Sequence, residues 1–280
     1  MKQLKFISVI ALSLCYLFTF NSCKKSEDSS LQLPPASSMN MDFNFTSITK
    51  SASETQTQVN YGLAAGTILI WSSIAYNLTN IPSLAFNKAL ENKPIYNSID
   101  KVWEWSYVTT VGNDKYSSKL TGEISGDSVQ WKMYLTKTGT GGSNLPFLWF
   151  EGKSHQGRTG GWWILNYTFP YNGSLVSDQG LKITWSYTND QVFFLRYTNI
   201  ATKKIDNGVY VDNDDKGGYI EYGRISDLNL DSYYTIHREK APSVTYDIVW
   251  NSKNKNGQIK QNGTPIGCWD VNKEDITCSN

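Results

Sequence analysis

Residues 129–136 run Val129-Gln130-Trp131-Lys132-Met133-Tyr134-Leu135-Thr136, so apolar and polar side chains alternate along this stretch. Successive side chains of a β-strand point to opposite faces of a sheet, and this period of two predicts a strand with one buried face. The same alternation recurs in residues 181–188 and 244–251. From residue 102 onward, the pattern therefore predicts a chain built of strands.

Short polar turns separate the predicted strands. Ser125-Gly126-Asp127, Thr188-Asn189-Asp190 and Asp206-Asn207-Gly208 are three of them. Links of this length join antiparallel neighbours, because a parallel crossover needs about a dozen residues or more. We therefore expect a mainly β fold, an antiparallel meander of about eleven strands between about residues 95 and 271. Such a sheet is expected to form a barrel or a strongly curved half-barrel, which limits its exposed edges.

Residues 59–93 favour helices instead. An apolar stripe at helical spacing runs from Leu63 to Ile81, and much of the remaining helix surface is also apolar. A helix that is apolar nearly all round has to be buried. We therefore expect Ile70, Trp71 and Ile74 to contact side chains of the sheet.

Two further features define this helical region. Pro82 is expected to end the first helix, and a second short helix is expected from Ser83 to about Asn92, which gives a buried helix pair. The stretch from Gly62 to Leu78 is short and contains polar side chains, so it does not favour a membrane span.

The first 22 residues have the layout of a signal peptide. Lys2 and Lys5 are followed by fifteen uncharged residues, from Phe6 to Phe20. The tetrad Phe20-Asn21-Ser22-Cys23 resembles the lipobox of bacterial lipoproteins, in the looser form found in Bacteroidetes-type bacteria. This resemblance implies that residues 1–22 are removed and that Cys23 carries the lipid, such as palmitate. It also implies anchoring in the outer membrane, on its periplasmic or cell-surface face; an ordinary cleaved signal peptide is the alternative.

Residues 23–58 are mostly polar and lack a period, so we expect a lipidated flexible tether there. The segment from Leu33 to Phe43 resembles one found in uncharacterised lipoproteins of the same group. Its prolines predict a stiff stretch that leads to an apolar anchor at Met39, Met41 and Phe43.

The composition of the remaining chain limits its function. Removing residues 1–22 leaves 258 residues with 24 basic and 25 acidic side chains, and a charge balance near zero argues against nucleic-acid binding. Residues 59–280 are expected to form a single β-rich domain. In an exported protein, Cys268 and Cys278 are expected to form a disulfide.

No established catalytic motif occurs in the sequence, and we expect no catalytic residue, metal site or cofactor. His155 and His237 have no nucleophile nearby in the sequence and are interpreted as structural or surface residues. Glu104, Glu151 and Glu221 lie in predicted strands among aromatic residues, where a glycosidase would carry its carboxylate pair. A carboxylate-dependent glycan-active enzyme therefore stays open as an alternative.

Aromatic side chains are the candidate ligand-binding groups. Trp103, Trp105, Trp162 and Trp163 lie on predicted strands, where they either fill the core or line an apolar or carbohydrate-binding concavity. We expect a membrane-anchored envelope lipoprotein with a binding or structural role. A buried helix beside a curved aromatic sheet resembles the arrangement in periplasmic lipoprotein carriers of the Lol type. A partner-binding component of an envelope assembly is the third possibility.

Overall fold

The computed structural model describes residues 31–40, 56–138, 146–171, 174–188, 191–225 and 229–278. The predicted signal peptide, the predicted lipidation site Cys23 and the predicted anchors Met41 and Phe43 lie outside these ranges. All elements below belong to one compact unit, residues 33–280.

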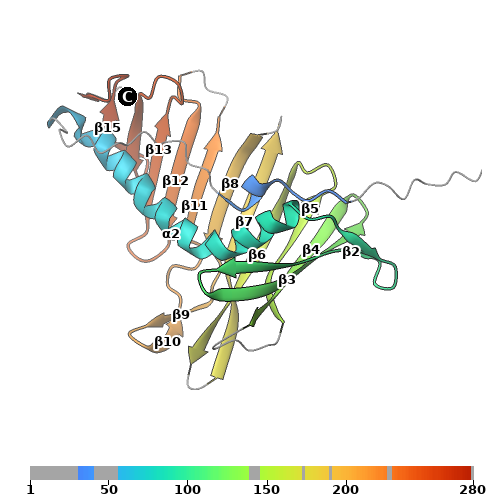
Figure 1. Ribbon diagram of the computed structural model, residues 1–280. Helices are drawn as coiled ribbons and strands as arrows, with labels where there is room; N and C mark the ends of the chain where they lie inside the picture. The colour runs from blue at the N-terminus through green and yellow to red at the C-terminus, as the bar shows by residue number, and fades with distance from the viewer. Residues whose placement is uncertain are drawn as a thin grey trace, which may run out of the picture. The chain divides into compact units, whose positions relative to one another are not determined.

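A single large antiparallel sheet dominates this unit (Figure 1). Fourteen strands follow one another in chain order, except that a separate two-stranded hairpin, β9–β10, is inserted between β8 and β11. The strands are β1 (Ile95–Asn97), β2 (Val102–Val111), β3 (Asp114–Ser125), β4 (Ser128–Thr138), β5 (Phe147–His155), β6 (Gly160–Tyr171), β7 (Ser174–Thr188), β8 (Gln191–Asn199), β9 (Lys203–Asp206), β10 (Val209–Asp212), β11 (Tyr219–Arg224), β12 (Ser232–Arg238), β13 (Val244–Trp250), β14 (Gly257–Gln261), β15 (Thr264–Trp269) and β16 (Asp275–Ile276).

The predicted antiparallel meander is confirmed, whereas the closed-barrel alternative and the expected number of strands are wrong. The sheet is open and not a closed barrel, since β1 and β16 are its two end strands. The described residues form sixteen strands and not about eleven. The additional strands β1, β9, β14, β15 and β16 have only two to six residues each, which is too short for alternation to stand out.

The helical region also differs from the prediction. One α-helix, α2 (Val59–Leu90), runs through Pro82, after the 3₁₀ turns η1 (Ala36–Ser38) and η2 (Gln56–Gln58). The expected helix pair is therefore wrong, because a proline inside a helix can bend it without ending it. Figure 1 shows α2 bending along its length. Within the described residues, no helix has the length and apolar content needed to cross a membrane.

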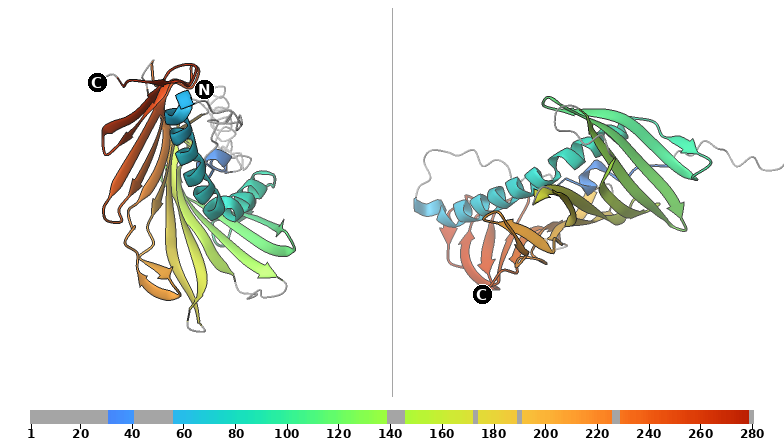
Figure 2. Two further views of the ribbon diagram at one scale, coloured as in Figure 1. Left: turned by 90° about the vertical axis from the view of Figure 1, so that its left-hand side faces the viewer. Right: turned by 90° about the horizontal axis from the view of Figure 1, so that it is seen from below.

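Helix α2 lies along one face of the sheet and links strands far apart in it (Figure 2). Its N-terminal end lies closest to β14, β15 and β16, and its C-terminal end lies closest to β2. Near the C-terminal end, the Phe86 ring contacts the rings of Trp163 and Phe150 at centroid distances of 5.4 and 6.4 Å, and the Tyr107 hydroxyl donates to the Ala85 carbonyl. The helix thus connects the two ends of the sheet.

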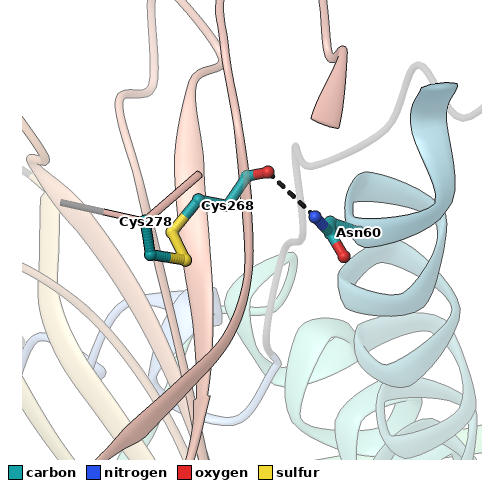
Figure 3. The surroundings of a disulfide bond; sticks show 3 residues. All are labelled: Asn60, Cys268 and Cys278. Carbon is teal, nitrogen blue, oxygen red and sulfur yellow. Dashed lines mark hydrogen bonds between the residues drawn. A yellow bond between two sulfur atoms is a disulfide. The ribbon is translucent and has the colours of Figure 1, made fainter. Parts of the chain in front are cut away.

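The N-terminal end of α2 is held by the last two strands. The backbone N–H groups of Val59 and Asn60 donate to the Asp275 carboxylate, at 3.2 and 2.9 Å, and the Asn60 side chain donates to the Cys268 carbonyl at 3.0 Å (Figure 3). Cys268 forms the predicted disulfide with Cys278, with Cα atoms 5.3 Å apart. A carboxylate from a distant strand therefore satisfies the free N–H groups at the start of the helix.

Replacing Asp275 with alanine removes this cap, and we expect the free energy of unfolding to fall by about 1–2 kcal/mol. Urea unfolding followed by circular dichroism measures the change. Glu274→Ala is the matched control, because Glu274 is the acidic residue next to Asp275 in the sequence and its side chain is exposed. An equal, negligible effect of both substitutions would contradict a capping role for Asp275.

The segment before α2 corrects the expected tether. Residues 33–40 pack against the sheet, where Ser38 and Met39 are buried. The Trp163 indole donates to the Ser38 hydroxyl at 3.2 Å, and the Tyr197 hydroxyl donates to the Met39 carbonyl at 2.6 Å. Within the described residues, the expected flexible tether is therefore wrong for this segment. The apolar anchor expected at Met39 is confirmed, because burying its side chain and pairing its backbone offset the entropy of ordering the chain.

Met39→Ala leaves a cavity in this contact, and we expect a loss of about 2–4 kcal/mol in the free energy of unfolding. Met39→Leu keeps the volume and is expected to cost less than about 1.5 kcal/mol. Chemical denaturation of the two variants checks this; if Met39→Ala unfolds at the wild-type midpoint, the segment is a tether after all.

Candidate functional site

The four tryptophans singled out from the sequence do not form one site. Trp105 and Trp163 are buried in the core, where Trp105 lies 5.8 Å from the Trp131 ring. Trp103 is half-buried and contacts Tyr96 near the first strand of the sheet. Trp162 precedes Trp163 on the same strand, so it points to the opposite face, where the Lys182 ammonium lies 6.0 Å from its ring. Ligand binding by these four stays a prediction, but the apolar cavity described below is built from other side chains.

The three candidate carboxylates are also separate from each other. Lys119 forms an ion pair with Glu104 at 2.9 Å, and this hydrogen-bonded lysine lowers the pKa of the Glu104 carboxyl. Glu221 accepts from Arg196 and from the Tyr233 hydroxyl. Glu151 is half-buried on β5. These carboxylates lie on β2, β5 and β11, and the structure does not bring them together as a catalytic pair.

The two histidines do not lie near each other in the sheet, and His237 also borders the cavity described below and lies 3.2 Å from the Glu239 carboxylate. His155 interacts with the Thr159 hydroxyl at 3.0 Å and is exposed. His237 interacts with the Thr245 hydroxyl at 2.8 Å and stacks on the Tyr219 ring. Across the residues that the structure describes, no group of three or more His, Cys, Asp or Glu side chains is placed to hold a metal ion.

A cavity of about 870 Å³ lies between the middle of α2 and the sheet. Its sheet wall includes Leu165, Leu181, Tyr197 and Ile220, which come from β6, β7, β8 and β11. Its helix wall is formed by Trp71, Ile74, Leu78, Ile81 and Pro82. Its volume is within the range typical of ligand-binding pockets, and its walls are largely apolar, as in most small-molecule sites.

The distribution of side-chain size along α2 explains why this cavity exists. The buried positions of α2 carry mostly small residues, namely Ala64, Ala65, Ala75, Thr79, Ser83, Ala85 and Ala89. Large apolar side chains occupy the exposed positions instead: Val59, Leu63, Leu69, Ile70, Ile74, Tyr76, Leu78, Leu84 and Leu90. Small residues allow close approach of the helix where it contacts the protein, and the larger side chains of the middle turns face open space.

The expectation that α2 is buried on nearly every face is therefore wrong. Ile70 is 62% exposed, and Ile74 is 43% exposed and borders the cavity. Trp71 is half-buried and also borders it. The sequence pattern indicated an apolar helix correctly, but it does not distinguish a helix that packs on a sheet from one that covers a hollow.

One end of the cavity is formed by the inserted hairpin β9–β10. The Asn213 side chain donates to the Ala201 carbonyl at 3.0 Å and to the Asn199 side chain at 3.1 Å, and the Asn199 side chain donates to the Asp215 carbonyl at 3.1 Å. These bonds fix the base of the hairpin to the end of β8 and to the turn that leads into β11.

Charged side chains gather at the same end. Lys203, Lys204, Arg238 and Lys240 border the cavity there, together with the two acidic residues Asp214 and Asp215. A hydrogen bond to Asp212 raises the pKa of Lys203, and one to Asp214 raises the pKa of Lys204. The Lys240 ammonium lies 3.4 Å from Asp214. The cavity is therefore apolar along its length and basic at one end.

A second hollow lies beside α2 and differs in chemistry. It has a volume of about 1040 Å³, and polar residues such as Ser72, Ser73, Asn77 and Arg158 form much of its lining. The first cavity is the better candidate for an apolar ligand, because most of its helix wall is aliphatic or aromatic.

No protein-family model, curated protein or solved structure matches this chain. The class defined by the structure is thus an open antiparallel sheet with a helix across one face and a cavity between them. Sequence reasoning found the helix wall through its apolar stripe. It missed the sheet wall and the basic end, because these residues come from strands that approach each other only in the folded chain.

Proposed function

We propose that this protein binds an apolar ligand in the cavity between α2 and the sheet. The observation that supports this most is that Trp71, Ile74 and Leu78 border a hollow of about 870 Å³ opposite an apolar sheet wall, and no side chain of the described residues fills it. Apolar side chains on the walls, such as Ile74 and Leu78, remain exposed to water, which is unfavourable for apolar surface. A ligand that occupies it would restore those contacts and remove apolar surface from water.

The proposal places this binding function in the bacterial envelope. The lipobox-like tetrad that ends at Cys23 supports a lipid anchor on the outer membrane, at its periplasmic or cell-surface side. The disulfide between Cys268 and Cys278 is consistent with an oxidising compartment outside the cytoplasm. A lipid-anchored protein with an apolar cavity is suited to holding poorly soluble molecules near a membrane.

The enzyme alternative has less support. Glu104 and Glu221 are each engaged with a basic side chain, and neither borders the cavity. The partner-binding alternative has one favourable observation, the large exposed apolar side chains of α2, such as Leu69 and Tyr76. Several of the helix side chains border the cavity as well, so ligand binding accounts for more of the observed arrangement.

Ile74→Asp is the substitution that tests the cavity. We expect the melting temperature to stay within a few degrees of wild type, because Ile74 is 43% exposed. The affinity for the neutral dye N-phenyl-1-naphthylamine is expected to fall about tenfold or more, because the new carboxylate is desolvated by the bound dye. Fluorescence titration measures the affinity.

Ile70→Asp is the matched control, since Ile70 lies one turn earlier on α2, is 62% exposed and does not border the cavity. It is expected to retain wild-type dye affinity. Dye binding that is equally weakened in both variants, or absent from the wild-type protein, would rule out the proposed cavity.

Cys23→Ser tests the anchor. The substitution is expected to move the protein from the membrane fraction to the soluble periplasmic fraction, because acyl burial contributes about 0.8 kcal/mol per methylene group. Fractionation of cells and intact mass of the purified protein provide the measurement. A protein that fractionates unchanged and shows no loss of lipid mass would refute the lipoprotein assignment.

A further inference from the structure

Arg238 differs from the other basic residues at the end of the cavity. Lys203 pairs with Asp212, and Lys204 and Lys240 both pair with Asp214. Within the described part of the chain, Arg238 forms neither an ion pair nor a side-chain hydrogen bond. The guanidinium group remains charged at all ordinary pH values, and of these four basic groups it is the one without an ion-pair partner among the described residues.

The position of Arg238 directs it toward the cavity. Strand β12 places Tyr234 and Ile236, both fully buried, on the face that carries the core. Side chains two residues apart share a face, so Arg238, two residues after Ile236, lies on the same side of the sheet. It is half-buried and borders the cavity. An unpaired cation thus stands where an apolar cavity reaches its polar end.

The nearby acidic residues are already occupied. Asp214 accepts from two lysines, and the Asp215 carboxylate accepts from the backbone N–H groups of Glu239 and Lys240 at 2.9 and 3.1 Å. These backbone bonds hold Asp215 against the turn that follows β12. The remaining positive charge at this end is therefore available to a ligand.

We propose that the ligand is an anionic amphiphile, whose hydrocarbon chain lies between α2 and the sheet and whose anionic head group pairs with Arg238. This inference rests on the proposed apolar-ligand function and adds the chemical class of the ligand. Arginine forms bidentate, charge-assisted hydrogen bonds with carboxylates and phosphates, and such bonds are stronger in a partly desolvated site. A fatty acid and a phospholipid share this chemistry.

Displacement of bound N-phenyl-1-naphthylamine tests the inference on the purified protein in detergent-free buffer. Oleate is compared with oleyl alcohol, which has the same chain without the charge. Oleoyl-lysophosphatidylglycerol is compared with the zwitterionic oleoyl-lysophosphatidylcholine. We expect the anionic member of at least one pair to displace the dye at about tenfold lower concentration. Preference within the oleate pair assigns a carboxylate head, and preference within the lysolipid pair assigns a phosphodiester.

Arg238→Gln should abolish this preference while the dye itself still binds, and Arg238→Lys should keep most of it. Lys216→Gln is the control for loss of a nearby positive charge, because Lys216 is exposed and does not border the cavity. Raising the salt concentration should weaken anion binding to wild type more than to Arg238→Gln. Equal displacement by charged and uncharged amphiphiles, with the dye bound normally, would overturn the role of Arg238 and leave the apolar cavity intact. Failure of the dye to bind wild type would overturn both proposals.

Discussion

The attachment of α2 at both of its ends is the constraint on which the rest of this structure depends. At the N-terminal end, Asp275 and the Cys268 carbonyl hold the first turn, and β16, which carries Asp275, is joined to β15 by hydrogen bonds and followed by the disulfide. At the C-terminal end, Phe86 packs on Trp163 of β6, and the Tyr107 hydroxyl of β2 donates to the Ala85 carbonyl. Between these two attachments, the cavity lies beneath the middle of the helix.

The choice of residues along the helix agrees with this arrangement. An amphipathic surface helix normally buries its large apolar side chains and exposes polar ones. In α2 the buried positions are mostly small residues, while leucine, isoleucine and tyrosine remain exposed. Small residues permit close packing at the contacts. Exposing large apolar side chains to water is unfavourable in free energy, and an apolar ligand or partner that covers them would remove that cost. The aromatic residues of the sheet, by contrast, fill the core: Trp105, Trp131 and Trp163 are fully buried.

The inserted hairpin β9–β10 places charged side chains at one end of a cavity whose other walls are largely apolar. It interrupts the chain order of the sheet and carries Lys203 and Lys204 to the end of an otherwise apolar space. A rigid sheet with function placed on an insertion is a common arrangement, because loops vary without cost to the core. Asp212 and Asp214 pair with the lysines there, whereas Arg238 has no ion-pair partner among the described residues. A near-neutral chain can therefore still present an unpaired charge beside an apolar cavity.

Much of the fold follows from the sequence, because its evidence is local. Alternation in residues such as 129–136 and 181–188 predicts strands, and the short turns between them predict antiparallel neighbours; both agree with the structure. The apolar helix and the pairing of Cys268 with Cys278 were likewise predictable. Tertiary structure alone decided that the sheet stays open, that α2 continues through Pro82, and that residues 33–40 pack against the sheet instead of forming a flexible tether. The cavity also depends on tertiary structure. Ile74, Leu181 and Arg238, which border it, are far apart in the sequence and come together only in the folded chain. The local sequence pattern determines which face of a helix or strand is apolar. The contacts that hold α2 at its two ends determine whether its apolar face packs on the sheet or borders the cavity.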